Sequence, residues 1–413
     1  MPKLDSPTSD IVIFGASSFV GQILTRYMLE QYPVDSDLSW AIAGRSASKL
    51  QDLKRSLGSA GAHIDVICAD ASNENELSAM CESTKCIIST VGPYALYGEP
   101  LLKTCARLGT DYCDLAGEVQ WIAKMLARYE DAAKLSGARI VNCCGFDSIP
   151  SDLGVYFLQQ QAKQKFSQPC SKVKMRVKAM KGAASGGTVA SMTNIFKEAA
   201  TDSALRKTLS NPYAICPKDY GFTVRQNNMN RPQYDADFKS WAAPFVMALI
   251  NTRIVFRTNA IIDEPYSDHF EYNEAMLTGS GIIGGSMAAA VGFGLGGFAM
   301  AAVIPPTRWL MEKTFLPKPG EGPSPEDQVK GFYDLRFYGV TDTGQEIRVK
   351  VTGDQDPGYG STAKMLGQAA ACLIQDISKE DRKGGFWTPA SIFGDKLINR
   401  LEAKAGLSFE VMD

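Results

Sequence analysis

The feature that most constrains the fold is a glycine-containing turn that directly follows a short apolar run near the N-terminus. Residues 11–14 read Ile-Val-Ile-Phe, and Gly15-Ala-Ser-Ser-Phe-Val-Gly21 follows them. A continuous apolar run of this kind is typical of a parallel strand that is buried on both faces. From Phe19 onward, apolar residues recur at helical spacing until shortly before Pro33. The sequence therefore predicts a strand, a tight turn and a helix, which together begin a βαβ unit.

The alternation of short apolar runs with amphipathic segments continues to about residue 145. Strands are expected at 38–43, 64–68, 86–91, 112–115 and 139–143, with helices near 47–57, 74–82, 99–108 and 119–136. We therefore expect residues 1–150 to form a Rossmann-type domain, a doubly wound parallel sheet of about six strands.

After residue 150 the apolar residues alternate with a period of two. Residues 172–179 alternate strictly between basic and apolar side chains, and the runs 332–340 and 345–351 flank a hairpin turn. The pattern predicts a second α+β domain over residues 151–357 with a largely antiparallel sheet, so that the fold class is α/β. Residues 358–413 are expected to form helices and a short strand that pack back on the first domain.

The glycine turn lies between a strand and a helix, which is the context that a dinucleotide fingerprint requires. Gly15 suits the tight turn, Gly21 suits a close approach of helix and strand, and the helix N-terminus would face a pyrophosphate. Ser18 stands where such folds usually carry a middle glycine. The alternative is a plain glycine turn. The predicted binding residues in this loop are Gly15, Ser17, Ser18, Phe19, Val20 and Gly21.

The end of the second expected strand indicates which dinucleotide would bind. An NAD enzyme usually places an acidic residue there to hold the ribose hydroxyls, but this chain has Arg45, Ser46 and Lys49. These side chains suit a 2′-phosphate, so NADP (as NADPH) is favoured over NAD. The alternative is an ordinary solvated loop. Asp70, just after the third strand, could accept a hydrogen bond from adenine or simply stabilise a turn.

Ligands of an open parallel sheet bind beyond the carboxyl ends of its strands. The loop after the fourth strand should therefore lie beside the nicotinamide ribose, through Thr90, Val91, Gly92 and Pro93. Candidate proton donors at this edge are Tyr94, Tyr97 and Asp147. Further polar residues there are Asp114, Glu118 and Ser148, although such residues more often serve in caps and turns.

Composition excludes several other classes of function. The chain has 43 basic and 45 acidic residues, a net charge of −2, so no global basic field favours nucleic acid. The two histidines, His63 and His269, lie outside any zinc-ligand spacing, and no metal site is expected. The ten cysteines lack a C-x-x-C pair and the first residues lack a signal-peptide pattern, which favours the cytoplasm over secretion.

Several motifs together resemble the saccharopine dehydrogenase-like oxidoreductases, and more closely their trans-acting enoyl reductase branch. They are the glycine turn, Ala-Gly-Arg-Ser, Thr-Val-Gly-Pro-Tyr, Tyr-Cys-Asp-Leu-Ala-Gly-Glu, Cys-Cys-Gly-Phe-Asp-Ser-Ile-Pro-Ser-Asp and the late run from Gly358 to Lys364. The resemblance spans the chain and implies an N-terminal NAD(P)-binding domain followed by a substrate domain.

The longest uncharged run covers residues 275–307, between Glu274 and Arg308, and is rich in glycine and alanine. Its 33 residues are long enough to span a membrane. It could instead lie on a membrane surface, form a buried helical hairpin or a homodimer interface, or line a tunnel for a lipid substrate. The basic face of residues 172–178 is either a solvated sheet face or a docking strip for an acidic acyl carrier protein or an anionic lipid surface.

These observations favour an NADP-dependent oxidoreductase that transfers hydride to an apolar substrate, such as a lipid or an enoyl compound. One alternative is a membrane or lipid-particle binding protein that keeps NADP as a structural or sensing ligand. A third is saccharopine-type chemistry on amino acids. The expected partners are a small-molecule or lipid substrate and, at the surfaces above, an acyl carrier protein, an anionic lipid surface or a second copy of the chain.

Overall fold

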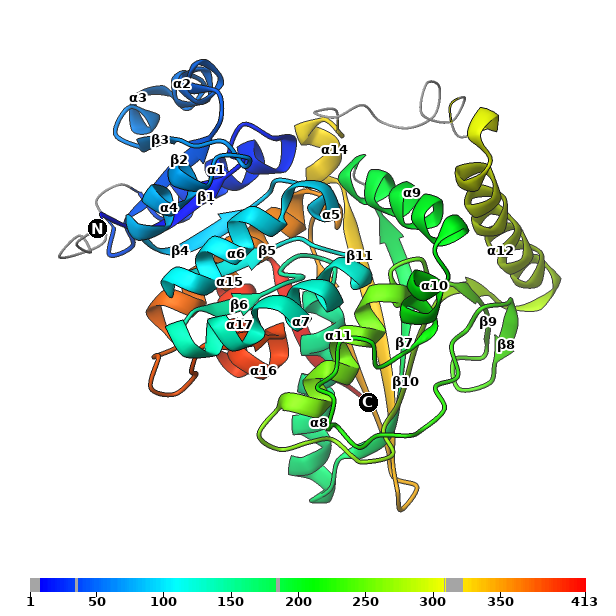
Figure 1. The fold of residues 1–413 in the computed structure, drawn as a ribbon. Helices are drawn as coiled ribbons and strands as arrows, with labels where there is room; N and C mark the ends of the chain where they lie inside the picture. The colour runs from blue at the N-terminus through cyan, green and yellow to red at the C-terminus, as the bar shows by residue number, and fades with distance from the viewer. Residues whose placement is uncertain (1–7, 34–35, 183–185, 308, 310–321) are drawn as a thin grey trace.

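The structure is a computed structural model that describes residues 8–33, 36–182, 186–307, 309 and 322–413 (Figure 1). Arg308 and the polar residues 1–7 lie outside the described part. Two seven-stranded sheets form the framework of the molecule, and helices cover both of them.

The first sheet is entirely parallel, with the strand order β13-β6-β5-β4-β1-β2-β3. Six of these strands lie where the sequence analysis expected strands, and a seventh, from the end of the chain, extends the β6 edge. The strands are β1 (Ser9–Phe14), β2 (Trp40–Gly44), β3 (Asp65–Cys68), β4 (Thr84–Ser89), β5 (Asp111–Asp114), β6 (Arg139–Val141) and β13 (Gly385–Trp387).

The predicted helices of this domain are confirmed to within one or two residues at most ends. They are α1 (Phe19–Gln31), α2 (Ala47–Ser56), α4 (Glu74–Glu82), α6 (Glu99–Leu108) and α7 (Val119–Ser136), with the short α3 (Gly58–Gly61) and α5 (Tyr94–Tyr97) between them. The late helix α15 (Gly360–Gln375) packs beside α1 and against β4 and β5. Its small, fully buried residues allow this close packing. The domain is of the Rossmann type.

The second sheet is mixed but mostly antiparallel, with the order β14-β12-β11-β7-β10-β9-β8, and only β7 and β10 run parallel. The predicted hairpin is confirmed as β11 and β12. The strands are β7 (Cys170–Lys181), β8 (Gln233–Asp235), β9 (Ser240–Pro244), β10 (Glu271–Gly279), β11 (Phe332–Thr341), β12 (Glu346–Gly353) and β14 (Leu407–Met412).

Two buried helices, α8 (Ile149–Phe166) and α11 (Ala248–Ile261), pack on the inner face of this sheet. The remaining helices are α9 (Gly186–Thr201), α10 (Ser203–Ser210), α12 (Gly281–Val303), α14 (Pro325–Val329), α16 (Pro389–Phe393), α17 (Asp395–Arg400) and the π-turn η1 (Leu401–Ala405).

The end of the chain contributes to both sheets. Helix α15 packs against the first sheet, and strand β13, which the sequence analysis did not expect, extends that sheet. The terminal strand β14 pairs with β12 instead, so for this strand the expectation was wrong. The reason is that β12 would otherwise leave an unpaired edge, which β14 covers.

The first residues of the uncharged run end β10, and most of the rest forms one long helix, α12, at the outer edge of the second sheet (Figure 1). Only Gly284, Ala288 and Ala302 of this helix are buried. The buried-hairpin interpretation was therefore wrong. Among the described residues, α12 is the one helix long and apolar enough to cross a membrane.

The basic strip of β7 differs from both interpretations of the sequence. Arg176 is buried and its Nε lies 2.7 Å from Asp235 Oδ2, while Lys174 pairs with Asp237 and Lys172 lies 3.2 Å from Glu271. Two of these acidic residues, Asp235 and Asp237, come from the chain around β8. No local sequence pattern could reveal this long-range contact. Residues 172–176 are therefore largely neutralised rather than freely basic.

Candidate functional site

The glycine turn after β1 has the close contacts that a dinucleotide loop needs. Gly15 has φ +88°, and a Cβ there would lie 2.7 Å from Thr90 Oγ1. A Cβ on Gly21 would lie 2.3 Å from the carbonyl oxygen of Gly15. Both positions therefore require glycine, the first for its conformation and the second for space.

Ser18, which replaces the usual middle glycine, has a structural role. Its Oγ accepts a hydrogen bond from Gly21 N at 2.9 Å and lies 3.0 Å from Thr90 Oγ1. The side chain thus caps α1 and connects the turn to the loop after β4. Within the described part of the chain, the backbone amides of Ser17, Phe19 and Val20 have no hydrogen-bond acceptor. Their free N–H groups fit a pyrophosphate at the start of α1.

The loop after β2 presents the predicted basic side chains to solvent. Arg45 and Lys49 are exposed, and Ser46 caps α2 by accepting from Lys49 N at 3.4 Å. Asp70 accepts hydrogen bonds from the hydroxyl and the amide of Ser72, at 2.7 and 2.8 Å. These bonds, and more weakly the charge of Arg45, lower the pKa of Asp70. Asp70 is thus a turn residue near Arg45.

The two candidate tyrosines lie in different environments. The Tyr94 hydroxyl is buried, donates to Ser89 O at 2.8 Å and accepts from Leu115 N at 3.1 Å. Burial raises the pKa of Tyr94 well above its usual value. Tyr94 therefore joins the loops after β4 and β5, whereas Tyr97 is 51% exposed. Gly92 and Pro93 follow Thr90 and Val91 and lead into α5, which begins at Tyr94.

Glu118 connects this loop to the second domain. Its buried carboxylate accepts from the amides of Tyr94 and Ala95, at 3.1 and 2.6 Å, and from Ser191 Oγ of α9 at 2.5 Å. The sequence suggested Glu118 as a possible acid, but these three bonds give it a positioning role. Ser191 was missed, because nothing near it in the sequence marks its contact with Glu118.

Asp114, at the end of β5, positions the neighbouring strand end. Its carboxylate accepts from Ala116 N at 3.0 Å, Cys143 N at 3.2 Å and Asn142 Nδ2 at 2.8 Å. Burial raises the pKa of Asp114 to about 6, although these hydrogen bonds oppose the shift. Its contacts are with backbone and amide groups, so its role is to fix the loops after β5 and β6.

Asp147, by contrast, has no hydrogen-bond partner within the described part of the chain. It is half-buried, and its Oδ2 lies 3.4 Å from the point where a Cβ on Gly117 would stand. Burial and then the charge of Glu274 raise the pKa of Asp147 to about 7. A carboxyl group with this pKa is substantially protonated at neutral pH, which is the property of a general acid.

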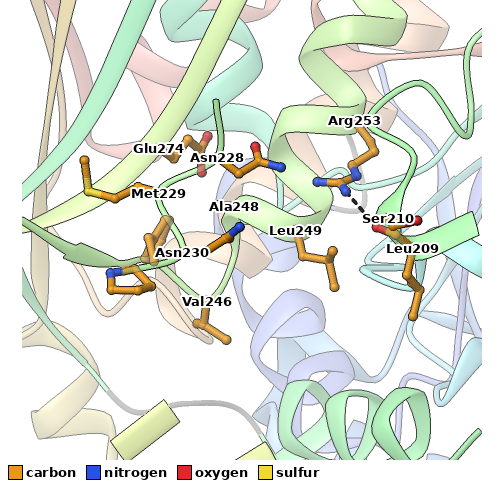
Figure 2. Close-up of a pocket in the computed structure, with 12 residues that line it drawn as sticks. Leu209, Ser210, Asn228, Met229, Asn230, Val246, Ala248, Leu249, Arg253 and Glu274 are labelled. Carbon is orange, nitrogen blue, oxygen red and sulfur yellow. Dashed lines mark hydrogen bonds between the residues drawn. The ribbon is translucent and has the colours of Figure 1, made fainter. Parts of the chain in front are cut away.

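Glu274 lines a cavity of about 340 Å³ in the second domain (Figure 2). Its carboxylate accepts from Tyr272 OH at 2.7 Å and Asn251 Nδ2 at 3.0 Å, and burial raises its pKa to about 7. On the other side, the buried Arg253 donates to Leu209 O at 2.8 Å. Its Nε has no acceptor among the described residues, and burial lowers its pKa to about 10. The rest of the lining combines the apolar Met229, Phe245, Val246, Ala248 and Leu249 with the polar Ser210, Asn228 and Asn230.

The late motif from Gly358 to Lys364 reaches the same edge of the first sheet. The rings of Tyr359 and Phe19 are 4.8 Å apart, and Thr362 Oγ1 accepts from Phe146 N at 3.0 Å. These residues therefore support the glycine turn and the loop that carries Asp147. The sequence analysis identified the motif by its resemblance but did not place it at the site.

Known proteins match this chain over nearly its full length. Residues 11–141 match the family described as the saccharopine dehydrogenase NADP binding domain. A putative trans-acting enoyl reductase of Mycobacterium tuberculosis is 36% identical over 97% of both chains, and a trans-acting enoyl reductase of Mycobacterium ulcerans is 34% identical over 95% of both. The chain belongs to the saccharopine dehydrogenase-like family, in its trans-acting enoyl reductase branch. This confirms the resemblance that its motifs indicated.

A solved structure also has this fold. Saccharopine dehydrogenase (L-Glu forming) from Saccharomyces cerevisiae superposes with a TM-score of 0.51 at 14% identity, covering 98% of this chain and 100% of the other. At that identity the likeness shows the fold alone. The full-length relatives and the matched domain family identify this member of the saccharopine dehydrogenase-like family as a reductase enzyme with an NADP-binding domain, which was the main functional prediction.

Proposed function

We propose that this enzyme uses NADPH to reduce the conjugated carbon–carbon double bond of an apolar acyl substrate. The observation that carries the proposal is Asp147, a carboxyl group with a pKa of about 7 and no hydrogen-bond partner among the described residues, at the carboxyl edge of a dinucleotide-binding sheet. The enoyl reductases among its relatives support the choice of double bond.

The residues present fit NADPH. The free amides of Ser17, Phe19 and Val20 would bind its pyrophosphate. Arg45, Ser46 and Lys49 would hold the 2′-phosphate, and Asp70 lies close enough to Arg45 for their charges to interact weakly. Thr90, Val91, Gly92 and Pro93 would border the nicotinamide ribose. The absence of an acidic side chain at the end of β2 favours NADPH over NADH.

NADPH, when bound, supplies a hydride to the β-carbon of the double bond. The α-carbon then needs a proton, and Asp147 can donate one because its acid form is populated at neutral pH. The Tyr94 hydroxyl already donates its proton to Ser89 O, so it serves to hold the loop. Tyr97, with an exposed ring, is the second candidate donor.

The cavity lined by Glu274 is proposed as the substrate pocket. The apolar part of its wall suits an acyl chain, and the unsatisfied Nε–H of Arg253 suits a carbonyl or other oxygen acceptor. The charge of Glu274 in this cavity raises the pKa of Asp147, the proposed proton donor. A carrier protein that docks on the basic strip 172–178 could present the acyl group. Within this strip, only Lys178 is exposed and without an ion pair in the described structure.

We propose a cytoplasmic location for the enzyme, associated with lipid through residues 275–307. All ten cysteines are free, which suits a reducing compartment. An apolar substrate would be concentrated in or on a membrane, and α12 provides the exposed apolar surface for contact with it.

The test is oxidation of NADPH, followed by absorbance, with 2-enoyl thioesters as substrates and with saccharopine and ketones as comparisons. We expect turnover with enoyl thioesters only. Asp147→Asn should lower kcat by about 100-fold or more while NADPH binding persists. Tyr97→Phe should keep most of the activity; if the tyrosine variant lost activity and the aspartate variant did not, Tyr97 would be the donor. No turnover of any enoyl substrate, with NADPH bound, would reject the proposed reaction.

A further inference from the structure

On helix α12 the large apolar side chains face outward and small residues face the protein, which is the reverse of what is expected of a soluble protein. Ile282, Ile283 and Phe293 are 89%, 82% and 82% exposed, and Met287 and Met300 are also exposed. The buried positions are Gly284, Ala288 and Ala302. Burial of large apolar side chains is the main stabilising contribution in water, so this arrangement indicates that something apolar covers the outer face.

The inner face of α12 is fixed to the protein along its length. A Cβ on Gly285 would lie 3.2 Å from the Trp241 ring, and one on Gly292 would lie 3.1 Å from Pro232. The rings of Phe298 and Phe196 of α9 are 6.3 Å apart. The helix therefore stays against β9 and α9, and its glycines permit that close contact. A helix held in this way lies along a surface rather than crossing a bilayer.

The exposed apolar side chains cover a wide sector of α12. At 100° per residue, the positions from Val303 through Ile282 and Phe293 to Met287 span roughly half of the circumference. Two copies of this helix packed across a two-fold axis would cover a narrow line of side chains and leave the rest in water. A fluid apolar phase covers the whole sector.

The groups around α12 are those of a lipid interface. No charged side chain occurs between Glu274 and Arg308. Arg231 precedes the Pro232 that contacts the helix, Lys239 lies two residues before Trp241, and both cations are exposed and without an ion pair in the described structure. The exposed aromatic rings of Tyr234 and Trp309 add the residues that favour the headgroup region.

We propose that α12 lies flat on an anionic lipid bilayer, with its outer half among the acyl chains and the nearby cations at the headgroups. The inference deepens the proposed location and does not depend on the hydride reaction. Helix α9 connects this surface with the site, because Phe196 contacts α12 and Ser191 bonds to Glu118. The bilayer would thus bring an apolar substrate to the side of the protein that carries the proposed pocket.

The experiment is flotation of the full chain with vesicles of phosphatidylcholine, with and without phosphatidylglycerol. The test variant is Ile282→Ser/Ile283→Ser/Phe293→Ser, whose positions make no buried contact. The matched control is Leu135→Ser, at a side chain that is 92% exposed on α7 of the first domain. We expect the triple variant to lose at least about tenfold in vesicle binding and the control to bind normally. Arg231→Gln/Lys239→Gln should weaken binding about fivefold or more per cation, to the anionic vesicles only.

NADPH binding and thermal unfolding are measured on the same variants, and both should be unchanged. Failure of the proposed reaction with intact vesicle binding would leave this inference standing, so the two are separable. The inference is overturned if the native chain does not float with either kind of vesicle. It is also overturned if light scattering shows a dimer that the triple variant dissociates, because α12 would then contact a second copy.

Discussion

At the scale of single residues, the site separates groups that position the chain from groups that can do chemistry. The positioning groups are Asp114, Glu118 and the Tyr94 hydroxyl. Their hydrogen bonds are with backbone groups and neighbouring side chains. Asp147 and Arg45 have no hydrogen bond in the described structure and lie at the edge where a dinucleotide would bind. The unsatisfied groups are therefore those available to ligands, and the first predictions concern them.

Arg45→Ala should weaken NADPH binding by about 10- to 100-fold and leave NADH binding nearly unchanged, because a bidentate bond to the 2′-phosphate is lost. Fluorescence titration with both dinucleotides measures the effect. Arg55→Ala is the control, since Arg55 is exposed and pairs only with Asp52 on the same helix. An equal loss for the two dinucleotides would contradict the role of Arg45.

The pH dependence of kcat/KM should report Asp147. Because burial and Glu274 raise its pKa to about 7, the acid form is lost as the pH rises through 7, and the rate should fall about tenfold per pH unit above that value. The pH profile of Asp147→Asn should lack this decline. A native profile that stays flat to about pH 9 would exclude Asp147 as the proton donor.

At the scale of elements, the local sequence predicted the order of strands and helices well. Short apolar runs, the Ser46 cap and Gly58 placed β2 and α2 correctly, because turn and cap chemistry is local. It could not predict β13 as the seventh strand, since three residues carry no periodicity of their own. A buried ion pair fixes this edge: Arg139 of β6 pairs with Asp111 of β5 and donates to Ile377 O and Leu373 O near the end of α15.

Arg139→Leu should lower the free energy of unfolding by about 3–5 kcal/mol, because it leaves Asp111 buried without its main partner. Urea unfolding followed by circular dichroism measures the change. Lys172→Leu, which removes an exposed partner of Glu271, should cost less than about 1 kcal/mol. Asp111→Leu added to Arg139→Leu should recover much of the loss; no recovery would mean that packing, and not the uncompensated charge, causes it.

At the scale of the whole molecule, the C-terminal segment holds the two sheets together. Strand β13 extends the first sheet and β14 covers the β12 edge of the second, with α16, α17 and η1 between them. Tyr27 OH also donates to Lys404 O, across nearly the full length of the chain. The two sheets therefore share one C-terminal segment and depend on each other for stability.

Removal of residues 376–413 should prevent cooperative folding of both domains, not only of the second. The deletion exposes an edge in each sheet and the buried faces of α8 and α15. Limited proteolysis and urea unfolding compare the shortened chain with Glu410→Gln, which changes only surface contacts of Glu410 with Lys350 and Ser408. A shortened chain that still binds NADPH and unfolds in one transition would show that the first sheet is independent.

Local sequence patterns were enough to predict the Rossmann-type domain, the glycine turn at Gly15 and Gly21, and the basic loop at Arg45. These features follow from periodicity, turn conformation and charge within a few residues of each other. Which polar groups are free became clear only from the folded chain. It placed Tyr94 inside and Tyr97 outside, neutralised Arg176 with Asp235, and left the large side chains of α12 exposed. Burial and pairing depend on partners distant in the sequence, and no local pattern contains them.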